Sequence, residues 1–85
     1  MNKKLFAIKD LKAQYYLKLI EADHEAVVVR SIQQDVQNEK SPLRQFPQDF
    51  ELFKLGEFNT ETGELIPIQP EHVLNVISLL PKEEA

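Results

Sequence analysis

The order of apolar and polar residues predicts two strands at the start of the chain. Leu5–Ile8 is a short apolar run between lysines, typical of a strand, and Asp10 ends it. Residues 13–19 then alternate, as expected for a strand with one buried face. A helix would spread these apolar residues around its whole circumference, so a strand is favoured. One side would carry Ala13, Tyr15, Leu17 and Leu19, and the other Lys12, Gln14, Tyr16 and Lys18.

A helix is predicted from Glu25 to about Gln37. Asp23 is suited to its N-cap, and Glu25 in the first turn complements the positive end of the helix dipole. The inward stripe recurs at spacings of three and four residues, although the valine run 27–29 contains poor helix formers. The stripe consists of Val29, Ile32 and Val36, and Asn38 with Ser41-Pro42 ends the helix.

A β-hairpin is predicted after a polar connecting loop at residues 38–49. The strand at 50–58 changes apolar phase between Leu52 and Phe53, which indicates a bulge or burial on both faces. Residues 59–63 form the turn, in which Gly63 supplies a positive φ angle. Residues 65–68 form the returning strand, and Pro67 places that strand at a sheet edge because proline cannot donate to a ladder.

The tail at residues 70–80 has two predictions. Pro70 followed by apolar residues at helical spacing up to Pro81 favours a helix that contacts a second subunit. The alternative is a core strand. The whole pattern predicts a single α+β domain over residues 1–85: a small antiparallel sheet of about four strands, one main helix and a C-terminal helix or strand.

Size and composition narrow the cellular setting. A chain of 85 residues has a marginal core and, without cysteine, no disulfide to support it, so we expect a homodimer. The absence of cysteine also fits a reducing cytoplasm. No apolar run reaches the roughly 20 residues of a membrane span. The basic-then-apolar start is interrupted by Asp10 and Lys12 too soon for a signal peptide, so secretion is not expected.

Charge is polarised along the chain, with a net value of −4 overall. Residues 1–20 carry five lysines against one aspartate, whereas residues 45–85 carry eight acidic residues against two lysines. This arrangement allows three interpretations: the basic end contacts phosphate, opposite ends pair between subunits, or the charges are simply solvated. A general polyanion binder is not expected.

Residues suited to catalysis or metal binding are scarce. The serines lie in no nucleophile motif, and the two glycines make no phosphate-cradling loop. His24 and His72 are far apart, and neither has another ligand at metal spacing. We therefore expect no enzymatic activity, no metal and no cofactor.

The strongest binding candidate is the polar side of the second strand. An exposed tyrosine between lysines can stack a nucleic-acid base while the ammonium groups neutralise phosphates. The candidate residues are Lys12, Tyr16 and Lys18, with Lys3, Lys4 and Lys9 extending the track. The alternative is that Tyr16 packs under the helix or a partner subunit. The phenylalanines of the hairpin, Phe50, Phe53 and Phe58, are expected in the core.

Several segments also resemble one family, the small non-structural protein of gokushovirus-type microviruses, which are single-stranded DNA phages. The likeness runs from about Leu5 to Ile66, and this chain departs from it after Tyr16, where the family commonly has prolines. The similar segments are Asp10–Tyr16, Glu25-Ala26 with Arg30, Ser41-Pro42, Pro47–Phe53, Leu55–Phe58 and Thr62-Gly63.

The resemblance implies a non-structural phage protein in the cytoplasm of an infected bacterium. It implies a role in viral DNA synthesis or in the switch to packaging, with DNA binding, and it transfers no catalytic residues to this chain. The resulting hypothesis is a homodimer that binds single-stranded DNA through Lys12, Tyr16 and Lys18. The alternative is a protein-interaction module that recruits or inhibits a host replication factor through the acidic hairpin or the apolar tail.

Overall fold

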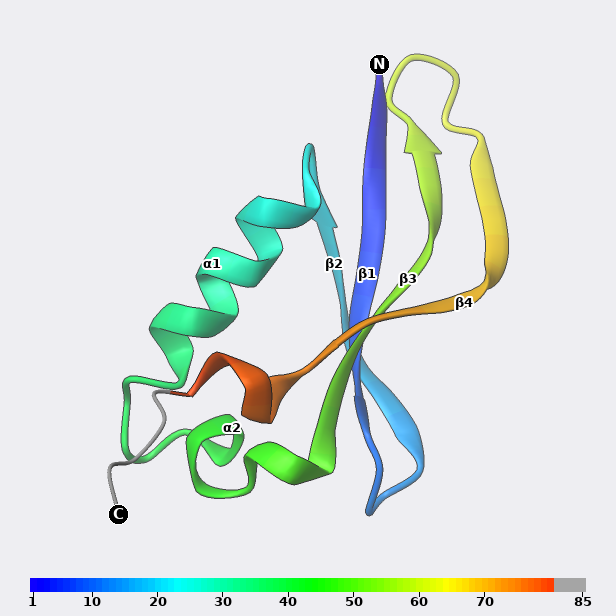
Figure 1. Cartoon of the computed structure of the whole chain (residues 1–85). Helices are drawn as coiled ribbons and strands as arrows, with labels where there is room; N and C mark the ends of the chain where they lie inside the picture. The colour runs from blue at the N-terminus through cyan, green and yellow to red at the C-terminus, as the bar shows by residue number, and fades with distance from the viewer. Residues whose placement is uncertain (81–85) are drawn as a thin grey trace.

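A four-stranded antiparallel sheet forms the framework of the computed structural model, which describes residues 1–80 (Figure 1). The strand order is β2-β1-β3-β4. The strands are β1 (Asn2–Asp10), β2 (Tyr15–Ala22), β3 (Phe50–Asn59) and β4 (Leu65–Asn75). Between β2 and β3 lie α1 (Glu25–Asp35), α2 (Pro42–Gln45) and the 3-10 helix η1 (Pro47–Asp49), and a second 3-10 helix, η2 (Val76–Leu79), follows β4. The predicted α+β class, with about four antiparallel strands and one main helix, is confirmed.

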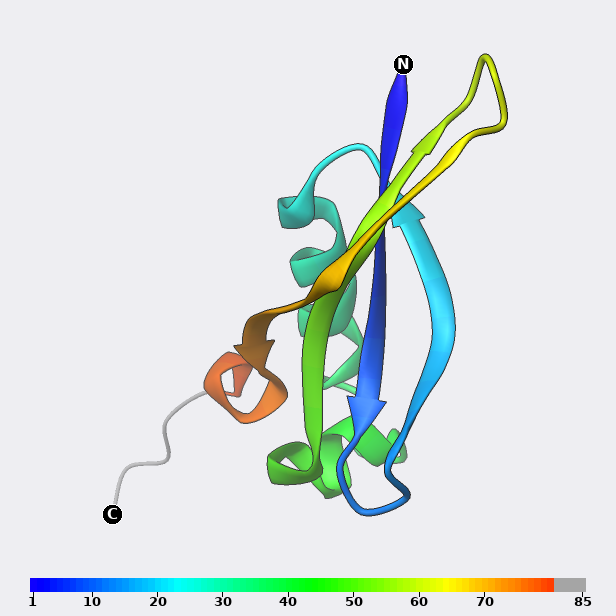
Figure 2. The same cartoon turned by 90° about the vertical axis from the view of Figure 1, so that its right-hand side faces the viewer.

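The helices cover one face of the sheet. In Figure 2, α1 and α2 lie behind the strands, and the opposite face is turned toward the viewer. Directly paired strand residues point to the same face, so Phe6 with Ile20 and Ile8 with Leu52 share the covered side. The core closes there around the fully buried Phe6, Leu52 and Val76. The helices within residues 1–80 leave the other face of the sheet uncovered.

Helix α1 begins two residues after Asp23, at Glu25, with His24 as its N-cap. The predicted N-cap role of Asp23 is wrong, because its carboxylate lies 2.7 Å from the Lys3 Nζ atom on β1 instead. The buried stripe of α1 is Val28, Ile32 and Val36, at spacings of four. Val29, which was predicted in this stripe, is only partly buried. The prediction is off by one residue because three successive valines do not show which of them faces the core.

The polar stretch at residues 38–49, predicted as a loop, contains α2 and η1. Ser41 starts α2: its Oγ accepts a hydrogen bond from the Leu43 amide and donates one to the Asp35 carboxylate. Pro42 follows at the first helical position, where its missing N–H is not needed. These contacts anchor Leu43, which is buried in the core.

Replacing Ser41 with alanine is expected to lower the free energy of unfolding by about 1–2 kcal/mol, because both an N-cap and a partly buried hydrogen bond to a carboxylate are lost. Urea denaturation followed by circular dichroism measures the change. Ser31→Ala is the matched control, since Ser31 is exposed on α1 and alanine favours a helix. An equal loss in both variants would contradict the capping role.

The connection between β1 and β2 differs from the predicted alternation. Residues 11–14 form a turn, in which Asp10 Oδ1 accepts the amides of Lys12 and Ala13 and Gln14 has φ 63°. Strand β2 therefore begins at Tyr15. The register shifts between Ala7, paired with Leu19, and Lys9, paired with Tyr16. Two β2 residues, Leu17 and Lys18, consequently stand opposite the single residue Ile8, as in a β-bulge.

The hairpin of β3 and β4 follows the prediction closely. Gly63 has φ 78° and its amide donates to the Asn59 carbonyl, which closes the turn. β4 is an edge strand, as Pro67 predicted. The pairing of β3 with β4 shifts between Leu52 and Phe53, where the apolar phase indicated a bulge.

The tail takes the strand alternative for most of its length. β4 continues through Pro70 to Asn75, and only η2 is helical, so the longer helix is not formed. Val76 in η2 is fully buried against the core. The predicted helix end at Pro81 lies outside the described residues. Within residues 1–80, every helix is too short or too polar to cross a membrane.

Candidate nucleic-acid interface

The uncovered face of the sheet carries a defined set of side chains. Lys9 on β1 pairs with Tyr16 on β2 and with Glu51 on β3, so these three share one face. Strand neighbours alternate between faces, and Ile8 lies in the core, so Lys9 points away from α1. The pairing of Ala7 with Phe53, and of Phe53 with His72, extends the same face across β3 to β4.

Three rings form a row across this face. The Tyr16 and Phe53 ring centroids are 5.7 Å apart at an interplanar angle of 84°, and those of Phe53 and His72 are 5.5 Å apart at 83°. Each contact is edge-to-face, which aromatic pairs prefer over a face-to-face sandwich. Tyr16 remains 37% exposed and Phe53 is half-buried. We call Tyr16, Phe53 and His72 the aromatic row.

A cation lies at the Tyr16 end of the aromatic row. The Lys9 Nζ atom is 5.5 Å from the centroid of the Tyr16 ring, within cation–π range. The ring is thus held from one side by Phe53 and from another by an ammonium group. A partly exposed ring beside a fixed ammonium offers both contacts that single-stranded nucleic acid uses, namely base stacking and phosphate neutralisation.

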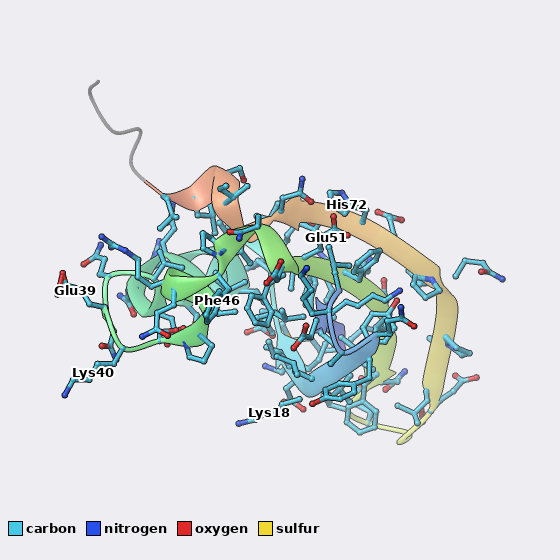
Figure 3. All side chains as sticks on the ribbon, turned by 90° about the horizontal axis from the view of Figure 1, so that it is seen from below. Lys18, Glu39, Lys40, Phe46, Glu51 and His72 are labelled. Carbon is cyan, nitrogen blue, oxygen red and sulfur yellow. The ribbon has the colours of Figure 1, made fainter. Side chains whose placement is uncertain are left out.

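The opposite end of the aromatic row is less favourable to phosphate. The Nε2 atom of His72 is 2.8 Å from Asn75 Oδ1 and 4.0 Å from the Glu51 carboxylate, and Figure 3 shows His72 and Glu51 close together beside β4. Glu51 is also the ladder partner of Lys9, so its carboxylate lies across from the cationic end of the row as well as near His72.

The structure brings together only Tyr16 and Lys9 of the six predicted residues. The prediction that Lys12, Tyr16 and Lys18 share one side of a strand is wrong, because Lys12 lies in the turn and Lys18 at the bulge opposite Ile8. Lys3 is paired with Asp23, and Lys4 stands opposite Glu57 in the ladder. The lysines therefore surround the sheet instead of forming one track.

The ion pair of Lys3 and Asp23 predicts a pH dependence of stability. Their hydrogen bond is the main cause that lowers the pKa of Asp23 and raises the pKa of Lys3. A carboxylate with a lowered pKa stabilises the fold above its ordinary pKa, near 4, and this contribution is lost as the pH falls through the lower folded value. The Lys3 contribution is present below its ordinary pKa and is lost only at strongly alkaline pH.

Asp23→Asn is therefore expected to flatten the acid-side fall in melting temperature between about pH 5 and pH 2. Thermal melts by circular dichroism at stepped pH measure this slope. Glu25→Gln is the control, because Glu25 forms no ion pair within residues 1–80. An Asp23→Asn slope equal to that of the unmodified protein would show that the ion pair does not contribute.

Sequence reasoning missed two members of the aromatic row. Phe53 was predicted in the core with Phe50, yet only Phe50 is buried, and Phe53 points to the open face beside Tyr16. The signal was present in the phase change between Leu52 and Phe53, which places adjacent apolar residues on opposite faces. His72 could not be assigned without knowing that its segment is a strand. Among residues 1–80, no three His, Asp or Glu side chains gather at metal-binding geometry.

Comparison with known proteins identifies one family. The family model described as Phage ORF5 protein matches residues 3–79, which include α1, the strands β2 to β4 and all of β1 except Asn2. No curated protein matches the chain. No solved structure matches it either.

Proposed function

Since this chain belongs to the Phage ORF5 protein family, we propose that it is a non-catalytic phage protein that binds single-stranded DNA through the open face of its sheet. The finer assignment to gokushovirus-type microviruses belongs to the same proposal. So does a role in viral DNA replication, or in the switch to packaging, in the cytoplasm of the infected bacterium. The single observation that carries the DNA-binding proposal is the partly exposed Tyr16 ring, held between Phe53 and Lys9.

The proposed contact is formed by the protein surface alone. A base stacks on the Tyr16 ring, and the Lys9 ammonium neutralises an adjacent phosphate. Lys12, in the turn next to the start of β2, lies where it can contact the following phosphate. A sheet face with a partly exposed ring suits unpaired bases, because the bases of a duplex are already stacked on one another.

Acidic and basic groups lie at both ends of the sheet. Much of the acidic charge lies on the β3–β4 hairpin, where Glu57, Glu61 and Glu64 are far along the strands from Tyr16. Basic groups balance that end, since the Met1 amino group pairs with Glu61 and Lys4 stands opposite Glu57 in the ladder. The Tyr16 end likewise carries Asp10 and Glu51 beside Lys9, so the position of the strand rests on the Tyr16 ring and the Lys9 ammonium next to it and not on a charge polarity of the sheet.

Fluorescence anisotropy tests this function. Labelled oligonucleotides, one single-stranded and one duplex of the same sequence, are titrated with the protein at two salt concentrations. The proposal predicts binding that favours the single strand and weakens as salt rises, because phosphate contacts release counterions. The absence of binding at the lower salt concentration, or an equal affinity for duplex, would contradict it.

A second candidate function rests on the exposed apolar side of β4. Leu65, Ile66 and Ile68 are all exposed, with Leu65 at 64%, and they follow the acidic turn that carries Glu61 and Glu64. Apolar residues beside acidic ones suit a protein partner better than DNA. This alternative is a module that recruits or inhibits a host replication factor.

Nuclease-treated host lysate distinguishes the two functions. Capture of a replication protein that persists after nuclease treatment, and is lost in a Leu65→Glu variant, favours the adaptor function. Capture that disappears with nuclease treatment favours DNA binding.

A further inference from the structure

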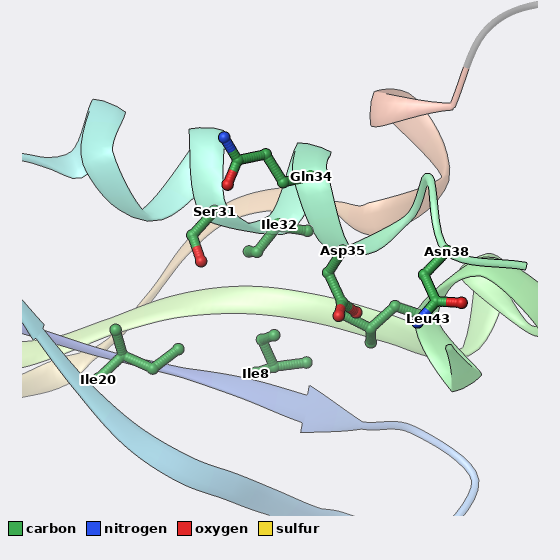
Figure 4. Close-up of a pocket in the computed structure, with 8 residues that line it drawn as sticks. All are labelled: Ile8, Ile20, Ser31, Ile32, Gln34, Asp35, Asn38 and Leu43. Carbon is green, nitrogen blue, oxygen red and sulfur yellow. The ribbon is translucent and has the colours of Figure 1, made fainter. Parts of the chain in front are cut away.

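The two faces of the sheet offer different chemistry to a ligand. On the covered face, a groove of about 460 Å³ lies between the strands and α1 (Figure 4). Ile8 and Ile20 line it from the strands and Ile32 from the helix. The carboxylate that lines it, of Asp35, is already bonded to the Ser41 hydroxyl. The open face instead presents polar groups beside rings, so it is the better surface for recognising a polar ligand.

A line of polar side chains crosses the open face beside the aromatic row. Lys9 on β1 is the ladder partner of Glu51 on β3, and Glu51 is in turn the partner of Asn75 on β4. Directly paired residues have Cβ atoms about 4.5–5.5 Å apart, so an ammonium, a carboxylate and an amide follow one another across three strands. We call Lys9, Glu51 and Asn75 the polar line. It borders the aromatic row because Glu51 and Phe53 lie two residues apart on the same face of β3.

The carboxylate and the amide of the polar line have unused hydrogen-bonding capacity. The Glu51 side chain is 25% exposed, and among residues 1–80 its one ion-pair contact is with His72 Nε2 at 4.0 Å, beyond hydrogen-bond range. His72 donates its Nε2 hydrogen instead to Asn75 Oδ1, at 2.8 Å. The Asn75 amide therefore keeps its two N–H groups for a ligand. Two acceptor oxygens thus stand next to an amide donor at the His72 end of the aromatic row.

Guanine is the base whose edge matches this arrangement. Its Watson–Crick edge carries two adjacent donors, the N2 amino group and N1–H, followed by the acceptor O6. A carboxylate accepts two such donors at once through its two oxygens, as it does with the fork of an arginine. Adenine, cytosine and thymine each carry a single donor on this edge with an acceptor next to it, which the second carboxylate oxygen repels. A carboxylate beside an amide therefore distinguishes guanine from the other three bases.

We propose that the polar line selects guanine in single-stranded DNA: the base stacks on the His72 ring, Glu51 accepts its N1 and N2 hydrogens, and Asn75 donates to O6. The His72 side chain is 47% exposed, and histidine is among the residues on which unpaired bases stack. A neighbouring base stacks on Tyr16 at the other end of the aromatic row, where Lys9 lies beside the ring. Glu51 then contacts a base edge and not a phosphate. This guanine site rests on the proposed DNA-binding function.

The base preference of the unmodified protein tests the guanine site. Fluorescence anisotropy compares a labelled oligonucleotide of thymine alone with the same oligonucleotide carrying one central guanine. The guanine oligonucleotide is expected to bind about tenfold more tightly, within the discrimination usual for a bidentate contact. Replacing that guanine with hypoxanthine, which lacks only the 2-amino group, is expected to remove most of the gain. A guanine gain that hypoxanthine keeps in full would overturn the carboxylate contact.

The same titrations separate this proposal from the proposed function. Equal affinities for the thymine and guanine oligonucleotides, both weakened in Tyr16→Ala, would overturn the guanine site and leave the DNA-binding function standing. No binding of either oligonucleotide at the lower salt concentration would overturn both.

Glu51→Gln shows whether the carboxylate is responsible. The substitution keeps the shape of the side chain but replaces one acceptor oxygen with an NH₂ donor, so the ratio of the guanine and thymine affinities is expected to fall close to one. Glu21→Gln is the matched control, because it changes the net charge equally and Glu21 is exposed on the same open face, opposite Leu5. This control is expected to keep the tenfold ratio. An unchanged ratio in Glu51→Gln, or an equal loss in Glu21→Gln, would overturn the proposal.

Discussion

Tyr16→Ala is expected to weaken the affinity for single-stranded DNA by about 1–3 kcal/mol, the contribution of one stacked base. The variant removes the exposed ring that Phe53 holds edge-on and that Lys9 approaches. The fold is expected to persist, because Tyr16 lies on an edge strand and the core forms on the opposite face. Anisotropy titration of a labelled single strand measures the affinity, and circular dichroism confirms folding.

Two further variants show whether stacking is responsible. Tyr16→Phe keeps the ring and is expected to keep most of the affinity. Tyr15→Ala removes the adjacent tyrosine, which is more exposed but pairs with Asp10 and is not part of the aromatic row. It is expected to bind nearly as well as the unmodified protein. Unchanged affinity in a folded Tyr16→Ala protein, or an equal loss in Tyr15→Ala, would contradict the assignment.

Gly56→Ala is expected to lower the free energy of unfolding by about 3 kcal/mol, at the upper end of the usual cost of overpacking. Gly56 lies on β3, where its neighbours are Leu5 on β1 and Pro67 on β4. A Cβ atom there would lie 2.3 Å from the Ile66 carbonyl oxygen and 3.1 Å from the Pro67 Cα atom. Both are backbone atoms of a paired strand, so relief requires β4 to move away from β3.

Gly63→Asn is the control for Gly56. Gly56 has φ 157° and Gly63 has φ 78°, so both are positive, but no atom lies within 4 Å of the position of a Cβ at Gly63. Asparagine tolerates the left-handed region. The control is expected to lose well under half as much stability in urea denaturation. Equal losses would mean that backbone conformation, and not the close approach of β4, determines the cost at Gly56.

Local patterns in the sequence were sufficient for most of the framework. Proline and glycine have few conformational options, so Pro67 correctly placed an edge strand and Gly63 correctly placed a positive φ. The helix was also found within two residues of its end, since Ile32 and Val36 fix its inward face. Each of these features depends on residues near one another in sequence.

The remaining features depend on contacts between distant segments. The bulge at Leu17 and Lys18 is set by pairing with β1, and it places Leu19, which was predicted on the other side of the strand, on the same face as Tyr16. Asp23 suits an N-cap by its type, but Lys3, twenty positions earlier, takes its carboxylate. The apolar residues of the tail recur at helical spacing, yet pairing with β3 makes the tail a strand as far as Asn75. At the candidate site, pairing between distant strands determines which side chains lie on the open face of the sheet. Phe53 was missed for this reason, whereas Tyr16 was identified from the lysines near it in the sequence.

The central claim is that the open face of the sheet, around Tyr16 and Phe53, contacts single-stranded DNA. Backbone amide chemical shifts recorded by NMR during titration with a short single-stranded oligonucleotide test it most directly. The predicted result is a set of shifts concentrated on Lys9, Lys12, Tyr16 and Phe53, with α1 and the turn at 59–63 unchanged. Shifts confined to α1 or to the hairpin, or no shifts at millimolar oligonucleotide, would contradict the claim.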